Sequence, residues 1–176
     1  DERDTIFQPQ VEIGKEAVDL SGQVLTPENA AAARQAVSQA LPAGALWQDH
    51  LRILLTPETP WALIRRGVTD LRREPGNFGE RISQALLGEA VRVLPLDKSP
   101  EEWAYVRMEN DGYMGWVHRQ ALHFCSADEA AAYRTACHAV VIAELANVHS
   151  VLPGESLQAS GGLPGKLPGK LPFGTR

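Results

Sequence analysis

The chain has 176 residues, enough for one ordinary domain or two small ones, and its 44% hydrophobic content is typical of a globular protein. Its net charge of −5 comes from acids and bases that are intermixed without long like-charged runs. We therefore expect no nucleic-acid partner. No stretch approaches the ~20 consecutive apolar residues of a membrane-spanning helix, so we also expect no membrane span.

The first 60 residues predict a small ββαβ module. Apolar residues alternate in two bursts between residues 5 and 24, which indicates a hairpin with its turn near Gly14. Thr26 and Pro27 then form a helix-start signal, and the alanine-rich helix continues to Leu41. Residues 51–55 alternate again and predict a third strand. His50 has no second metal ligand or acid at a useful spacing, so we interpret it as structural.

Residues 61–125 predict a small β-barrel, because short strands alternate with turn signals. Asn110-Asp111-Gly112 is typical of a tight hairpin whose glycine needs a positive φ. Trp103 and Trp116 are expected to point into the barrel core, whereas Trp47 and Trp61 are expected at the junction with the preceding module. The expected strands cover residues 62–70, 84–87, 90–94, 103–108 and 115–118, with a last piece near residue 122.

Residues 126–152 predict a connection in which a helix begins at Ser126, ends near Thr135 and leads to a strand-like stretch. Cys125 and Cys137 flank this helix and would lie beyond the ~7 Å limit for a disulfide, so we expect two free thiols. Residues 153–176 contain a near-repeat of Leu-Pro-Gly-Lys. We interpret this segment as a linker, with a ligand for a partner domain as the alternative.

Four blocks of the barrel region cover residues 68–75, 82–89, 103–107 and 111–117. In their order and spacing they resemble the SH3b domain of NlpC/P60 cell-wall peptidases, a family that cuts between γ-D-glutamate and a diamino acid. The resemblance implies a mainly β chain with an α+β part, namely the ββαβ module followed by an SH3-like barrel. It also implies that a second SH3b domain begins after the helix and is incomplete within residues 153–176.

The same resemblance implies that the catalytic domain lies outside this chain. The nucleophile of the family stands in an Asp-Cys-Ser-Gly motif, whereas this chain has Phe124-Cys125-Ser126-Ala127. His118 and His123 also lack an arranged acid partner. We therefore predict no catalytic residue, metal or cofactor here, while the parent protein would be an NlpC/P60 cysteine peptidase.

In related peptidases the first SH3b domain helps to form the pocket for the free amino end of a wall-derived peptide. By resemblance, Glu89 and Tyr113 are the candidate substrate-binding residues, because a carboxylate can pair with an ammonium group and a phenol adds a flat apolar face. The alternative is that Glu89 is a solvated strand end and that Tyr113 packs in the barrel.

The predicted function is the non-catalytic targeting and substrate-recognition region of a cell-wall hydrolase. Its partners would be peptidoglycan-derived peptides and a catalytic NlpC/P60 domain of the same protein. One alternative is a stand-alone SH3b protein that binds peptidoglycan without cutting it, and another is a complete enzyme of unfamiliar chemistry. We expect the cell envelope or secretion as the location. The charged residues 1–4 do not form a signal peptide, and an export signal that had been removed earlier would leave no trace in the sequence. A cytoplasmic location is therefore the alternative.

Overall fold

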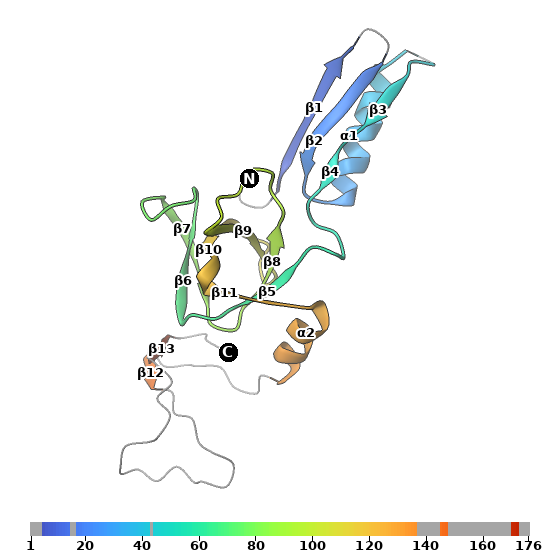
Figure 1. Cartoon of the computed structure of the whole chain (residues 1–176). Helices are drawn as coiled ribbons and strands as arrows, with labels where there is room; N and C mark the ends of the chain where they lie inside the picture. Colours follow the sequence, from blue (N-terminus) through green and yellow to red (C-terminus); the bar gives the residue numbers. More distant parts are fainter. Residues whose placement is uncertain (1–4, 15–16, 43, 137–144, 148–169, 173–176) are drawn as a thin grey trace, which may run out of the picture.

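The structure is a computed structural model, and it describes residues 5–14, 17–42, 44–136, 145–147 and 170–172 (Figure 1). Its described part forms a ββαβ unit, then a seven-stranded sheet, then a short helix. This is the mainly β architecture with an α+β unit at the front that the sequence predicts. Neither described α-helix is long and apolar enough to cross a membrane.

The first unit has its elements in the predicted order, but its third strand is divided. Strand β2 pairs antiparallel with β1 on one side and parallel with β3 and β4 on the other. The strand predicted over residues 51–55 is present as β4, whereas β3 before it was not predicted; the two are separated where the Asp49 carboxylate accepts the Leu51 backbone N–H at 3.0 Å and turns the chain. The elements are β1 (Phe7–Ile13), β2 (Val18–Val24), α1 (Pro27–Ala40), β3 (Trp47–Asp49) and β4 (Arg52–Ile53).

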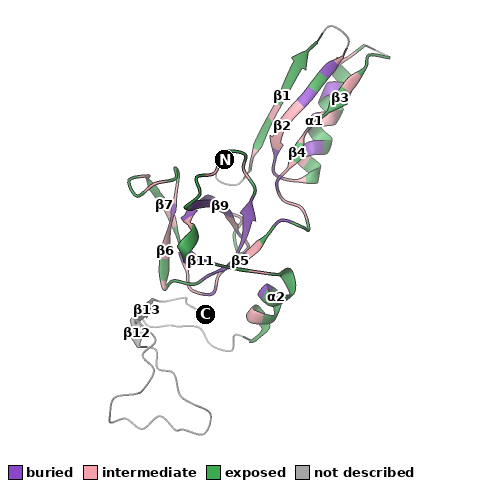
Figure 2. Cartoon of the chain, in the orientation of Figure 1, coloured by how far each residue is buried: buried purple, intermediate pink, exposed green. Residues whose placement is uncertain are grey.

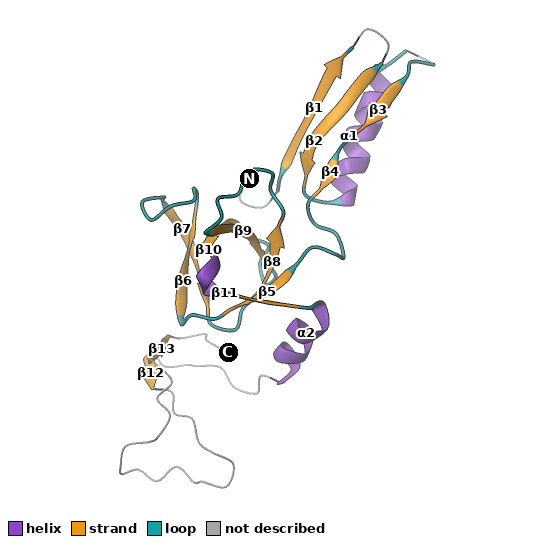
Figure 3. Ribbon diagram, viewed as in Figure 1, coloured by secondary structure: helices purple, strands orange, loops and turns teal. Residues whose placement is uncertain are grey.

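Helix α1 begins where the sequence signal predicts it. The Thr26 hydroxyl accepts the Asn29 backbone N–H at 3.3 Å, and the Asn29 side-chain oxygen accepts the Thr26 backbone N–H at 3.2 Å. The helix lies against one face of the sheet (Figure 3). The buried residues of this layer come from the helix and from β2: Ala30, Ala33, Val37, Val18, Leu20 and Val24. The opposite, helix-free face of β1 and β2 carries polar side chains.

The second part is one open, strongly curved sheet in the order β11-β5-β8-β9-β10-β6-β7 (Figure 1). Strands β11 and β7 lie at its two ends, so the barrel-like sheet of the described residues is not closed by a further ladder. The strands are β5 (Trp61–Ile64), β6 (Val68–Arg72), β7 (Arg81–Leu86), β8 (Ala90–Leu94), β9 (Trp103–Met108), β10 (Met114–His118) and β11 (Leu122–Cys125), with a 3-10 helix at Arg119–Ala121.

The prediction of one strand over residues 62–70 is wrong, because this stretch forms β5 and β6, which are not neighbours in the sheet. The chain leaves β5 at Arg65, whose backbone N–H donates to the Ala121 carbonyl at 2.9 Å. It then passes Gly67 and enters β6 beside β7 and β10.

The main core lies inside the curved sheet (Figure 2). Val91, Val106 and Val117 are fully buried there. Trp103 and Trp116 are buried as predicted, but the prediction that they point into this core is wrong. They alternate along their strands with Val106 and Val117, so they lie on the outer face of the sheet.

A second apolar cluster joins the two parts of the chain. Leu25 and Leu54 of the first unit pack with Leu94 and Met114 of the sheet, and all four are buried. Partly buried residues around them are Ile6, Leu55, Leu96 and Tyr105. This contact explains why Leu94, Tyr105 and Met114 on the outer face of the sheet are apolar.

The two tryptophans predicted at the junction have different places. Trp47 pairs with Val18 at the start of β2, at the end of the sheet that points away from the barrel, so its predicted role is wrong (Figure 1). Trp61 lies under the Arg92 guanidinium, which is 4.5 Å from the ring centre. Arg92 also donates to the carbonyl oxygens of Thr56 and Thr59 and so holds the connecting segment on the sheet.

Helix α2 (Ala127–Ala136) follows β11 and begins at Ser126 as predicted. The Ser126 hydroxyl accepts the Glu129 backbone N–H at 3.2 Å, and the Glu129 carboxylate accepts the Ser126 backbone N–H at 2.7 Å. Strands β12 (Leu145–Asn147) and β13 (Lys170–Pro172) pair antiparallel. The remaining predictions for residues 137–176, including Cys137 and most of the Pro/Gly-rich segment, lie outside the described residues.

Candidate functional site

Glu89 stands at the turn that leads from β7 into β8, and its carboxylate is held in place. One carboxylate oxygen accepts the Leu86 backbone N–H at 2.8 Å, and the other accepts the Asn110 side-chain amide at 2.9 Å. The side chain is half-buried. A carboxylate has about four acceptor positions, so each oxygen can accept one further hydrogen bond.

A small cavity of about 50 Å³ opens beside Glu89. Its wall combines two carboxylates and one guanidinium, because Glu109 and the exposed Arg134 of α2 line it together with Glu89. Arg107 lies 3.7 Å from the Glu109 carboxylate and partly neutralises it. The cavity can therefore receive a small charged group, but it is too small to enclose a whole peptide.

Tyr113 lies at the same end of the sheet as Glu89, directly before β10, but it has a different environment. It is half-buried and packs against the main core, and its backbone N–H donates to the Asp111 carboxylate at 2.9 Å. Tyr113 is not among the residues that line the small cavity, so the structure does not bring it into one pocket with Glu89. A binding role for either residue stays a prediction.

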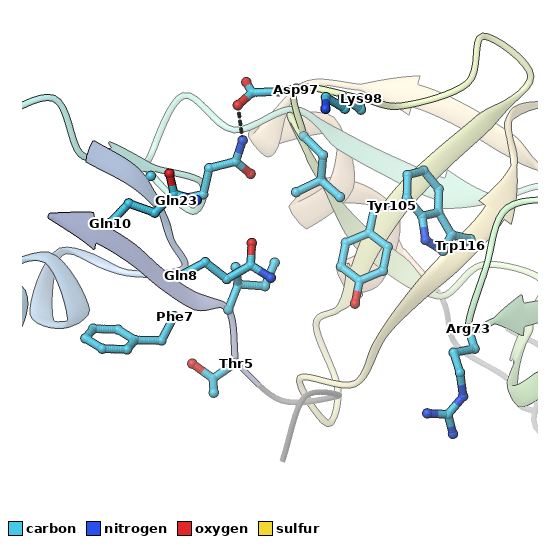
Figure 4. A pocket seen from close by; sticks show the side chains of 13 residues that line it. Thr5, Phe7, Gln8, Gln10, Gln23, Arg73, Asp97, Lys98, Tyr105 and Trp116 are labelled. Atoms are coloured by element: carbon cyan, nitrogen blue, oxygen red, sulfur yellow. Dashed lines mark hydrogen bonds between the residues drawn. The ribbon is translucent and has the colours of Figure 1, made fainter. Parts of the chain in front are cut away.

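A much larger cleft of about 990 Å³ lies between the ββαβ unit and the outer face of the curved sheet (Figure 4). Sequence reasoning missed it. The cleft has an aromatic side formed by Tyr105 and Trp116, whose ring centres are 5.1 Å apart at an angle of 60°. The facing side comes from β1 and β2 and carries glutamines. The lining residues are Thr5, Ile6, Phe7, Gln8, Gln10, Gly22, Gln23, Arg73, Leu96, Asp97, Lys98, Tyr105 and Trp116.

Asp97 lines this cleft from the connection between β8 and β9. Its carboxylate accepts a hydrogen bond from the Gln23 amide (Figure 4) and another from the Arg52 guanidinium, so it ties β2 and β4 to the sheet. Together with the apolar junction, these bonds hold the two walls of the cleft in one arrangement. The sequence signal that could have found part of it is the alternation of Gln8 and Gln10 along β1, which sets both on one face.

Cys125 does not have the surroundings of an activated thiolate. Burial and the neighbouring Glu129 carboxylate raise the pKa of its thiol. His118, a histidine near Cys125 in the sequence, accepts the Gln120 backbone N–H at 3.2 Å, and its ring packs edge-on against Trp103 with the ring centres 5.4 Å apart. A raised thiol pKa disfavours nucleophilic attack at neutral pH.

Comparison with known proteins agrees with the architecture of the sheet. Residues 71–122 match the family described as the bacterial dipeptidyl-peptidase Sh3 domain. This stretch runs from β6 to the start of β11 and is less than half of the chain. The fold and the match together define this part of the chain as an SH3b domain of the type found in bacterial peptidases. No curated protein matches the chain.

Proposed function

We propose that this chain is the non-catalytic targeting and substrate-recognition region of a bacterial cell-wall hydrolase of the NlpC/P60 cysteine-peptidase type. The SH3b domain and its match to a bacterial peptidase family support this proposal. The proposed partners are peptidoglycan-derived peptides and a catalytic domain of the same protein, in the cell envelope or outside the cell. The proposal includes an incomplete second SH3b domain within residues 153–176.

The observation that carries the proposal is the cavity with the oriented Glu89 carboxylate. Leu86 and Asn110 each donate one hydrogen bond to it and thereby fix its direction. The free amino end of a peptide carries an ammonium group, which can donate to Glu89 and lie near Glu109. Arg134 on the other wall can bind a carboxylate of the same peptide.

Tyr113 is the second proposed contact. It is half-buried at the same end of the sheet, where its ring can provide an apolar face for the part of the peptide beyond the amino end. Because the ring packs on the main core, its contribution is expected to be smaller than that of Glu89.

The test is calorimetric titration of this chain with the tripeptide L-Ala-γ-D-Glu-diaminopimelate and with its N-acetylated form. We expect Glu89→Gln to weaken binding of the free peptide about 10- to 150-fold, because a charge-assisted hydrogen bond contributes about 1.5–3 kcal/mol. Glu101→Gln is the matched control, since it removes the same charge at an exposed residue outside both pockets. Equal affinity of the chain for both peptides would contradict the proposed recognition of the amino end.

A further inference from the structure

We propose that the cleft between the ββαβ unit and the SH3b domain is a saccharide-binding site for an uncharged, N-acetylated amino-sugar oligomer. This goes beyond the peptide recognition proposed above, because the cleft and the Glu89 cavity have no lining residue in common. The proposal stands on the shape of the cleft, its aromatic wall, its glutamine wall and its charge balance.

The size and shape suit an oligomer. At about 990 Å³ the cleft is at the upper end of the range for small-molecule sites, roughly 300–1,000 Å³. It lies between two parts of the chain that are joined by the buried Leu25, Leu54, Leu94 and Met114. The walls are therefore in place before a ligand arrives, which lowers the entropy cost of binding.

The aromatic wall can pack against sugar rings. Tyr105 and Trp116 lie opposite each other on the neighbouring strands β9 and β10, and both line the cleft (Figure 4). Trp116 is buried, so the half-buried Tyr105 presents the larger part of this wall. Leu96 continues this apolar surface. A pyranose ring has an apolar face of C–H groups, and a flat aromatic side chain with a polar tip can cover that face.

The opposite wall offers matching polar groups. Gln8 and Gln10 are exposed and extend from the same face of β1, about 7 Å apart along the strand. Each primary amide has two N–H donors and an acceptor oxygen, so it can bind sugar hydroxyls and acetamido groups equally well. Their spacing allows each glutamine to contact a different part of an oligomer.

The charges at the cleft favour an uncharged ligand. The Asp97 carboxylate already accepts from Arg52 and Gln23, and Arg73 lies 2.7 Å from the Glu80 carboxylate. Lys98 at the rim adds one positive charge. A site for a phosphate or a polyanion would need several convergent cations.

The experiment titrates this chain with tetra-N-acetylchitotetraose and follows ¹⁵N-NMR shifts and tryptophan fluorescence. We expect shifts at Gln8, Gln10 and the Trp116 indole. Gln8→Ala and Gln10→Ala should each weaken binding about fivefold, because each removes a neutral hydrogen bond. Both residues are exposed, so the fold should tolerate these changes. Gln48→Ala is the control, because Gln48 is exposed on the same helix-free face but outside the cleft.

The outcomes separate this site from the peptide site. Glu89→Gln should leave the affinity for the tetrasaccharide unchanged, and Gln8→Ala should leave the affinity for the tripeptide unchanged. The absence of any NMR shift at millimolar tetrasaccharide would overturn the proposal. So would shifts outside the cleft, an equal loss in Gln48→Ala, or tripeptide-induced shifts at Gln8 and Gln10.

Discussion

The turn between β9 and β10 allows a quantitative test of the SH3b architecture. Gly112 has a φ of 77°, in the left-handed region that a β-branched residue adopts only with strain. Its backbone N–H donates to the Met108 carbonyl at 3.0 Å, and Met108 donates in turn to the Tyr113 carbonyl at 2.9 Å. Gly112→Val must therefore either take up the strained φ or break this hydrogen-bonded turn.

The cost has two parts. A non-glycine residue held in the left-handed region costs about 1–3 kcal/mol. A Cβ at this position would also lie 2.9 Å from Nη2 of Arg107, which is the far end of a flexible side chain and can move at small cost. We expect Gly112→Val to lower the free energy of unfolding by about 2 kcal/mol. For a protein of this size, that corresponds to a fall in Tm of about 4–8 °C.

The measurement is urea unfolding followed by tryptophan fluorescence, in which the midpoint should fall while the m-value stays constant. Gly112→Asn should recover most of the loss, because asparagine tolerates a positive φ. Gly44→Val is the second control, since Gly44 has a φ of 84° and a Cβ there meets nothing within 4 Å. An unchanged midpoint in Gly112→Val would refute the assigned turn, and an asparagine variant as unstable as valine would assign the loss to Arg107 instead.

Three further predictions concern the junction, helix α2 and the cysteine. Leu54→Ala should lower the free energy of unfolding by about 2–5 kcal/mol in the same urea assay, because Leu54 is fully buried between the two parts of the chain; a loss below about 1 kcal/mol would contradict that packing. Hydrogen bonds from Ser126 lower the pKa of Glu129 in the folded chain, so its stabilising effect is complete above the unfolded pKa and disappears as the pH falls through the lower folded value. Glu28 of α1 also has a lowered pKa, so the loss of helix signal by circular dichroism between pH 6 and pH 2 should be larger in the chain than in Glu129→Gln; equal losses would contradict the role of Glu129. Burial and Glu129 raise the pKa of Cys125, so iodoacetamide should label its thiol slowly at pH 7 and faster above about pH 9. Peptide mass mapping can measure the labelling, and rapid labelling at pH 7 would refute this prediction.

Local signals in the sequence were sufficient for several elements. The Thr26 and Pro27 signal correctly predicted the start of α1, and the Ser126 signal correctly predicted the start of α2. Asp111-Gly112 correctly predicted a positive φ. These features depend on contacts within about four residues, so the chain carries the necessary information locally.

Strand periodicity was sufficient for some strands and misleading for others. It predicted a strand around Trp116, but it could not tell which side of β10 faces the main core. The same limit explains the single strand predicted over residues 62–70 and the misplaced Trp47. Alternation defines two faces, and only the packing of distant strands decides what covers each face.

At the candidate sites, long-range packing decides even more than it does for the strands. The sequence singled out Glu89 through its resemblance to the SH3b family, but only the fold brings Arg134 of α2 to the same cavity. Strand alternation is enough to set Gln8 and Gln10 on one face of β1, but only the fold brings the aromatic pair of β9 and β10 to the opposite side of the cleft. The sequence by itself thus determined the helix starts, the hairpin turn at Gly112 and most of the strands. The cleft was decided by the burial of Leu25 and Leu54 against the outer face of the sheet, a long-range contact that no local pattern encodes.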